Sequence, residues 1–111
     1  MSTRPETVTA LLDTLADAGP LSARAMFGEY ALYLGDRVVA LICDDRLFLK
    51  PTPGALALMS GATLAPPYPG AKPHIAADHA LDDPERVVMA LRAVLADLPA
   101  AKPKKPKGAA R

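Results

Sequence analysis

The chain has 111 residues, of which 50% are hydrophobic and 23% are charged. This composition is typical of an ordinary globular domain and excludes a disordered or fibrous protein. A chain of this length buries roughly two-thirds of the surface that its unfolded form exposes, so we expect one domain with one core. Cys43 is the only cysteine, which excludes an internal disulfide and a multi-cysteine metal site. No apolar run has the length of a signal peptide or membrane helix, so we expect a cytoplasmic protein.

The net charge of +1 hides an asymmetry between the body of the chain and its end. Residues 1–100 carry 8 Lys and Arg against 12 Asp and Glu, a net charge of −4, whereas residues 101–111 carry five cations and no acid. Residues 99–111 contain only Pro, Ala, Lys, Gly and Arg, which offer too little apolar surface to offset the entropy lost on ordering. We therefore expect a folded domain over residues 1–98 and a disordered basic tail over residues 99–111.

The first predicted element is a helix over residues 4–18. Thr3 and Glu6 have the spacing of a capping box, in which each side chain accepts a hydrogen bond from an orphaned backbone N–H at a helix start. Apolar residues then recur at the helical period of 3.6, at Val8, Leu11, Leu12 and Leu15. Gly19 and Pro20 provide the stop signal.

From Ala23 onward the pattern changes to short apolar stretches separated by pairs of turn-forming residues, which predicts a β-meander. We place its strands at residues 22–27, 30–35, 37–43 and 46–50. The breaks fall at Gly28-Glu29, Gly35-Asp36 and Asp44-Asp45, and Asp44-Asp45 is a weaker turn signal than Gly35-Asp36.

The second half of the chain alternates helical and extended segments. Residues 53–60 have the apolar content of a short helix closed by Gly61, whereas the proline-rich segment 66–70 must be extended because each proline fixes its own φ. A short strand is expected at 73–77. Asp83-Pro84 predicts the start of a last helix that ends before Pro99. Its predicted buried stripe is Val87, Leu91, Val94, Leu95 and Leu98.

Several segments together resemble the N-terminal domain of the TfoX/Sxy competence-regulator family. They are the run from Arg24 to Tyr33 (RAMFGEYALY), the stretch from Val38 to Asp45, Leu47 to Lys50 (LFLK), the segment from Pro66 to Pro73 (PPYPGAKP), and the helix entry from Leu81 to Pro84 (LDDP). The resemblance covers about residues 5–98. Two positions depart from the common motif, since Glu29 and Ala31 stand where glycines are frequent.

The resemblance implies an α+β domain in which three helices pack on a mainly antiparallel sheet, in an α-β-β-β-α-β-β-α-like order. Family members that carry a second, C-terminal domain are associated with regulating natural competence, together with a cyclic-AMP-responsive transcription activator. This chain is too short to hold that second domain, so we expect a single-domain member. The function expected is a non-enzymatic regulatory or protein-interaction module.

Both faces of the predicted meander are apolar. One alternating set contains Tyr30, Leu32, Leu34, Val38, Ala40 and Ile42, and the opposite set contains Tyr33, Val39, Leu41 and Phe48. An antiparallel sheet with one solvated face would alternate apolar and polar residues, so the second face must also be covered. The cover is either the chain's own helices and proline-rich segment or a second molecule, as in a homodimer.

The sequence predicts no catalytic, cofactor or metal site. His74, Asp78 and His79 lie close together, but their spacing matches no metal motif, and we interpret them as solvated loop residues. Cys43 has no nearby group to stabilise a thiolate. Asp44 and Asp45 offer paired carboxylates for acid–base chemistry, yet they sit at a turn.

The candidate interaction patch consists of Arg24, Tyr30, Lys50, Tyr68 and Lys72. These are the cationic and aromatic members of the segments that carry the resemblance, and such residue types are favoured at protein interfaces. The alternative interpretation is ordinary surface charge with strand tyrosines. A second functional hypothesis is weak nucleic-acid binding by the basic tail, since five cations can displace counterions from phosphates.

Overall fold

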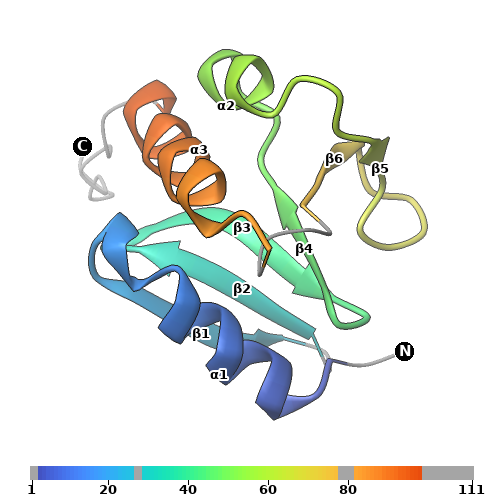
Figure 1. Cartoon of the computed structure of the whole chain (residues 1–111). Helices are drawn as coiled ribbons and strands as arrows, with labels where there is room; N and C mark the ends of the chain where they lie inside the picture. Colours follow the sequence, from blue (N-terminus) through green and yellow to red (C-terminus); the bar gives the residue numbers. More distant parts are fainter. Residues whose placement is uncertain (1–2, 27–28, 78–81, 99–111) are drawn as a thin grey trace, which may run out of the picture.

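A computed structural model of the chain describes residues 3–26, 29–77 and 82–98 (Figure 1). Within those residues the structure has three α-helices and a six-stranded antiparallel sheet, which confirms the predicted α+β class. In chain order the elements are α1 (Pro5–Thr14), a 3-10 turn η1 (Ala16–Ala18), β1 (Leu21–Met26), β2 (Glu29–Leu34), β3 (Arg37–Cys43), β4 (Arg46–Leu49), α2 (Pro53–Leu58), β5 (Leu64–Ala65), β6 (His74–Ala76) and α3 (Pro84–Asp97). The predicted tail lies outside the described residues.

The sheet has the strand order β1-β2-β3-β4-β6-β5. Its first four strands are the predicted meander, and each begins and ends within one residue of its expected bounds. The turn between β3 and β4 is tight because Asp44 and Asp45 both have positive φ, 54° and 62°. Two successive positive φ values are the signature of a type I′ turn, whose twist matches that of a two-strand hairpin. This turn pairs Cys43 directly with Arg46.

The helices α1 and α3 lie on the same face of the sheet (Figure 1). The main core fills the space between these helices and the strands. Helical core residues include Val8, Leu11, Leu15, Val87, Leu91 and Val94, and strand core residues include Leu32, Leu34, Ile42, Leu47, Leu49 and Ile75. The core therefore combines the period of 3.6 in the helices with the period of two in the strands.

The capping box predicted at the first helix is wrong. The N-cap residue of α1 is Arg4, and Pro5 occupies the first helical position, where its missing N–H costs nothing. The Thr3 hydroxyl instead lies in the interior, where it donates to Glu29 Oε1 at 2.5 Å and to the Ile42 carbonyl at 3.2 Å. The helix ends at Thr14, and the chain continues through η1 to Ala18.

One side-chain alternation in the meander is also wrong. The pairing of β2 with β3 contains a bulge between Leu32 and Tyr33, so Leu32 faces Ala40 while Tyr33 faces Val38. A bulge adds one residue to one strand and shifts the inward and outward alternation beyond it. Val39 is consequently in the main core, and Val38 lies opposite Tyr33, the reverse of the predicted assignment.

The later elements follow the prediction with small differences. Helix α2 ends at Leu58, two residues early, and the Thr52 side chain caps its start by accepting from the Ala55 amide. The expected strand at 73–77 is β6, which pairs with β4 and with the two-residue strand β5. In α3, Ala90 belongs to the buried stripe, whereas Leu95, which was predicted to belong to it, is exposed.

None of the helices in the described part of the chain is long and apolar enough to cross a bilayer.

Candidate functional site

The sheet face that points away from α1 and α3 carries a second, smaller apolar cluster. Its buried members are Cys43, Phe48 and Ala76, with Leu41 and Ala65 packed against them. The register aligns three of these residues across neighbouring strands, because Leu41 pairs with Phe48 and Phe48 pairs with Ala76. The chain itself therefore covers the middle of the second face.

A pocket of about 840 Å³ opens beside this cluster, and we call it the second-face pocket. Its lining consists of Met26, Glu29, Cys43, Asp44, Arg46, Phe48, Pro66, Pro67, Tyr68 and Pro69. Ligand pockets in proteins typically enclose about 300–1,000 Å³, so the volume lies within that range.

The floor of the second-face pocket is a row of side chains from four adjacent strands. Met26 pairs with Glu29 across β1 and β2, and Cys43 pairs with Arg46 across β3 and β4. The register that pairs Tyr30 with Ile42 brings Glu29 next to Cys43. The pocket thus runs across the strands at the end of the sheet that holds the Asp44-Asp45 turn.

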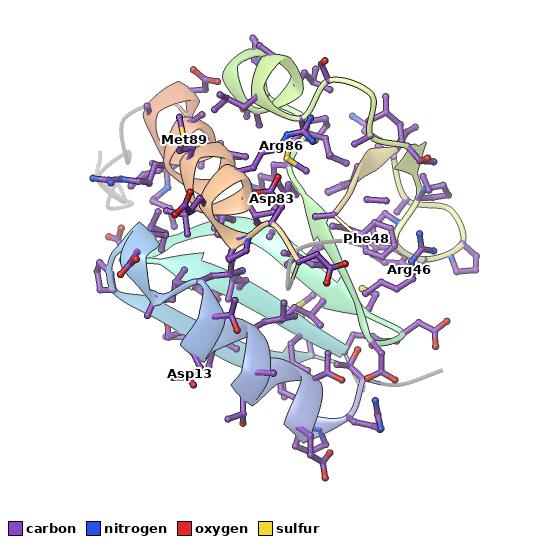
Figure 2. The ribbon with its side chains drawn as sticks, in the orientation of Figure 1. Asp13, Arg46, Phe48, Asp83, Arg86 and Met89 are labelled. Carbon is purple, nitrogen blue, oxygen red and sulfur yellow. The ribbon has the colours of Figure 1, made fainter. Side chains whose placement is uncertain are left out.

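The proline-rich segment 66–69 forms one wall of the pocket. Pro67 is buried, while the Tyr68 side chain is 50% exposed. Figure 2 shows Arg46 and Phe48 beside this segment, and the Arg46 guanidinium carbon lies 5.0 Å from the centroid of the Phe48 ring. Prolines fix their own φ angles, so this wall is stiff.

Two carboxylates, from Glu29 and Asp44, add negative charge to the pocket lining. Glu29 Oε1 accepts from the Thr3 hydroxyl and, at 3.0 Å, from the Asp44 amide, which holds the Glu29 side chain in place. Burial, together with the charges of Glu29 and Asp44, raises the pKa of the Cys43 thiol to about 11. At neutral pH the thiol is therefore protonated, so it offers the pocket a packing surface rather than a nucleophile.

The neighbouring carboxylate, Asp45, joins the same turn to the start of α1. Its Oδ1 accepts from the Arg4 amide at 2.9 Å and from the Thr7 hydroxyl at 2.8 Å, and its Oδ2 lies 3.4 Å from Arg4 Nε. These hydrogen bonds and the Arg4 charge lower the pKa of Asp45 below its usual value. The Asp45 carboxylate is therefore engaged with the start of α1, whereas Asp44 lines the second-face pocket.

The five residues of the candidate interaction patch lie in different parts of the molecule. Tyr68 lines the second-face pocket. Arg24 is on the same sheet face, where its guanidinium carbon lies 5.1 Å from the centroid of the Tyr33 ring. Lys72 is exposed and follows the proline-rich segment. Tyr30 packs against the main core on the helix-covered face. Lys50 follows β4, and burial and the nearby Arg37 charge lower its pKa.

The histidine and aspartate group from the sequence is only partly described. His74 Nδ1 lies 2.8 Å from the Lys72 carbonyl, which fixes the ring at the start of β6. Asp78 and His79 lie outside the described residues. Within the described part of the chain, no three His, Cys, Asp or Glu side chains gather closely enough to hold a metal ion.

Sequence reasoning missed most of the pocket lining, notably Met26, Glu29, Arg46 and Phe48. The available signal was the second apolar face of the meander, which includes Phe48. Glu29 was a further signal, since it places a charge at the edge of that face. Neither signal shows that the proline-rich segment returns to form a wall.

Comparisons with known proteins agree with the fold. Residues 13–98 match the TfoX N-terminal domain family. The chain is also similar to a Spirochaeta aurantia protein described as an uncharacterized 12.7 kDa protein in the trpE 5′ region. That protein is 44% identical over 82 residues, which cover 74% of this chain and 71% of the relative.

Proposed function

Because this chain belongs to the TfoX N-terminal domain family, we propose that it is a non-enzymatic regulatory module that recognises a partner protein through the second-face pocket. The family match supports a regulatory role. The single buried cysteine supports a reducing compartment, and we place the module in the cytoplasm.

The observation that carries this proposal is the composition of the pocket. An aromatic side chain that is half exposed, Tyr68, stands on a stiff proline wall, and the exposed apolar side chain of Met26 belongs to the same pocket. Aromatic residues, Met and Arg are enriched at protein interfaces, and hot spots cluster in such pockets. The groups at the pocket suit binding better than catalysis, since its thiol is protonated and its Glu29 carboxylate is held by hydrogen bonds.

The test is affinity capture, in which the tagged 111-residue chain is the bait and partner proteins are captured from a lysate of cells that express the chain. The pocket variant is the double substitution Met26→Ala, Tyr68→Ala, which removes side chains that are 37% and 50% exposed. The control variant is Leu56→Ala, Met89→Ala, which removes side chains that are 39% and 55% exposed on α2 and α3. The two variants therefore remove comparable amounts of exposed apolar surface from different places.

We expect wild type and the control variant to retain the same partner and the pocket variant to lose it. If all three proteins capture equal amounts of the partner, as measured by quantitative mass spectrometry, the pocket is not the recognition site. Circular dichroism of the three proteins checks that each variant is folded.

A second candidate function is nucleic-acid binding by the basic residues 101–111, which carry five positive charges against the −4 of residues 1–100. Phosphate contacts of this kind are strongly salt-dependent. The tail explains such binding only if a chain truncated after residue 100 binds DNA much more weakly than the full chain at low salt.

A further inference from the structure

We propose that the second-face pocket binds an extended segment of the partner in which a Lys or Arg side chain stands beside apolar residues. This inference rests on the proposed function, because it specifies the partner's chemistry at the same site. Three properties of the pocket lead to it: its length across four strands, its apolar proline and tyrosine wall, and its two carboxylates.

The shape of the pocket favours a chain segment over a round small molecule. Its floor takes one residue from each of β1, β2, β3 and β4, at Met26, Glu29, Cys43 and Arg46. Neighbouring strands lie about 4.8 Å apart, so this row is roughly 14 Å long. Since an extended chain advances about 3.3 Å per residue, the row accommodates about four residues.

The apolar part of the pocket selects apolar side chains at one end of that segment. Phe48 is buried in the second cluster, and Pro66, Pro67, Tyr68 and Pro69 face it as the opposite wall. Tyr68 is half exposed and carries a hydroxyl, so it contributes a large contact area and one polar group. An apolar side chain of the partner inserted here would contact Tyr68 and the exposed Pro66 and Pro69.

The charged part of the pocket selects a cation. Glu29 and Asp44 contribute two negative charges to the lining, and Arg46 contributes one positive charge, which leaves the lining at −1. The Arg46 guanidinium lies over the Phe48 ring at the β4 end of the row, whereas hydrogen bonds from the Thr3 hydroxyl and the Asp44 amide hold Glu29 in place on β2. A Lys or Arg side chain lying over Glu29 and Asp44 complements these two carboxylates, and an acidic residue is repelled there.

The experiment is selection from a phage-displayed library of random dodecapeptides against the immobilised full chain. We expect the selected sequences to be enriched in Lys or Arg next to large apolar residues and depleted in Asp and Glu. Synthetic peptides from the selection, labelled and titrated by fluorescence anisotropy, then give affinities. Replacing the cation by Gln should weaken binding by about three- to five-fold, the effect of one partly screened ion pair.

The variant Asp44→Asn tests the charge, because Asn tolerates the left-handed backbone at this position and removes only the negative charge. The matched control is Asp36→Asn, the same substitution in the turn between β2 and β3. Asp44→Asn should reduce the preference for the cationic peptide over its Gln counterpart, and Asp36→Asn should leave that preference unchanged. Raising the salt concentration should also reduce the preference.

The inference is overturned if the selected peptides show no enrichment in Lys or Arg, or if the Met26→Ala, Tyr68→Ala variant selects the same peptides as strongly as wild type. It is also overturned if Asp44→Asn and wild type prefer the cationic peptide over its Gln counterpart to the same extent. Binding of phenethylammonium as tight as that of the best peptide would assign the pocket to a small organic cation instead. If the pocket variant loses the lysate partner but the selected peptides show no preference for Lys or Arg, the proposed function is retained and only the proposed chemistry of the partner is wrong. If basic peptides bind but the pocket variant still captures the lysate partner, the proposed function is wrong.

Discussion

Asp44 and Asp45 are adjacent in one turn, yet their carboxylates belong to different parts of the molecule. Asp45 accepts hydrogen bonds from Arg4 and Thr7 at the start of α1, whereas Asp44 lines the second-face pocket. Both residues have positive φ, a conformation that Asp tolerates better than most residues. The turn thus contributes one side chain to the helix start and the other to the pocket.

The hydrogen bonds of Asp45 make part of the stability pH-dependent. Because its pKa is lowered in the folded protein, its contribution is present above the ordinary Asp pKa and is lost as the pH falls through the lower, folded value. We expect Asp45→Asn to lower the free energy of unfolding at pH 7 and to lessen its fall toward pH 3, as measured by urea denaturation. The control Asp36→Asn should retain the wild-type acid dependence, and an Asp45→Asn protein with that full dependence would contradict the role of Asp45.

Cys43 should be unreactive in the folded protein despite lying at the pocket. Its pKa of about 11, against an ordinary value of 9.0, leaves about one-hundredth of the usual thiolate at pH 8. Reaction with a thiol-specific disulfide reagent should therefore be slower in buffer than in denaturant by roughly that factor or more, since the side chain is also buried. Equally fast reaction in both conditions would show that the thiol is accessible and activated.

The bulge in the pairing of β2 with β3 decides which valine supports the core. Val39 is fully buried among core residues, and Val38 is half-buried opposite Tyr33. We expect Val39→Ala to lower the free energy of unfolding by about 2 kcal/mol, because it removes two buried methyl groups and leaves a cavity. The same substitution at Val38 is the control and should cost less than half as much in urea denaturation. Equal losses in the free energy of unfolding for the two substitutions would show that Val38 and Val39 are buried to the same extent, contrary to the bulge.

Helices α2 and α3 approach each other closely at Gly54. Its amide donates to Asp97 Oδ2 at 2.7 Å, and a Cβ added at Gly54 would lie 2.7 Å from that oxygen and 3.2 Å from the Ala93 Cβ. We expect Gly54→Ala to destabilise the protein by about 1–2 kcal/mol, since crowding exceeds the helix propensity that alanine gains. Asp97→Ala should cost less in the Gly54→Ala background than in wild type, which a double-mutant cycle by thermal unfolding measures. Additive costs would show that the destabilisation by Gly54→Ala does not come from crowding against Asp97.

The second sheet face bears on whether the molecule associates with itself. Phe48 and Ala76 are buried by the chain's own segments, and Arg24 stacks on Tyr33, so much of this face is already covered. We therefore expect a monomer of 11.6 kDa in multi-angle light scattering. A mass twice as large, lost in the Met26→Ala, Tyr68→Ala variant but kept in the Leu56→Ala, Met89→Ala variant, would instead make the second-face pocket a homodimer interface.

Sequence by itself determined the α+β class, the meander and most of the buried residues of α1 and α3, because each depends on a local period of apolar residues or on a turn between neighbours. The connections that the structure adds are not local. Asp45 reaches Arg4, 41 residues away, and Thr3 reaches the Ile42 carbonyl, 39 residues away. The bulge that exchanges Val38 and Val39 depends on how two strands pair. The second-face pocket likewise exists only because the proline-rich segment folds back beside Phe48. The pattern of residues within a segment does not determine which distant part of the chain that segment packs against.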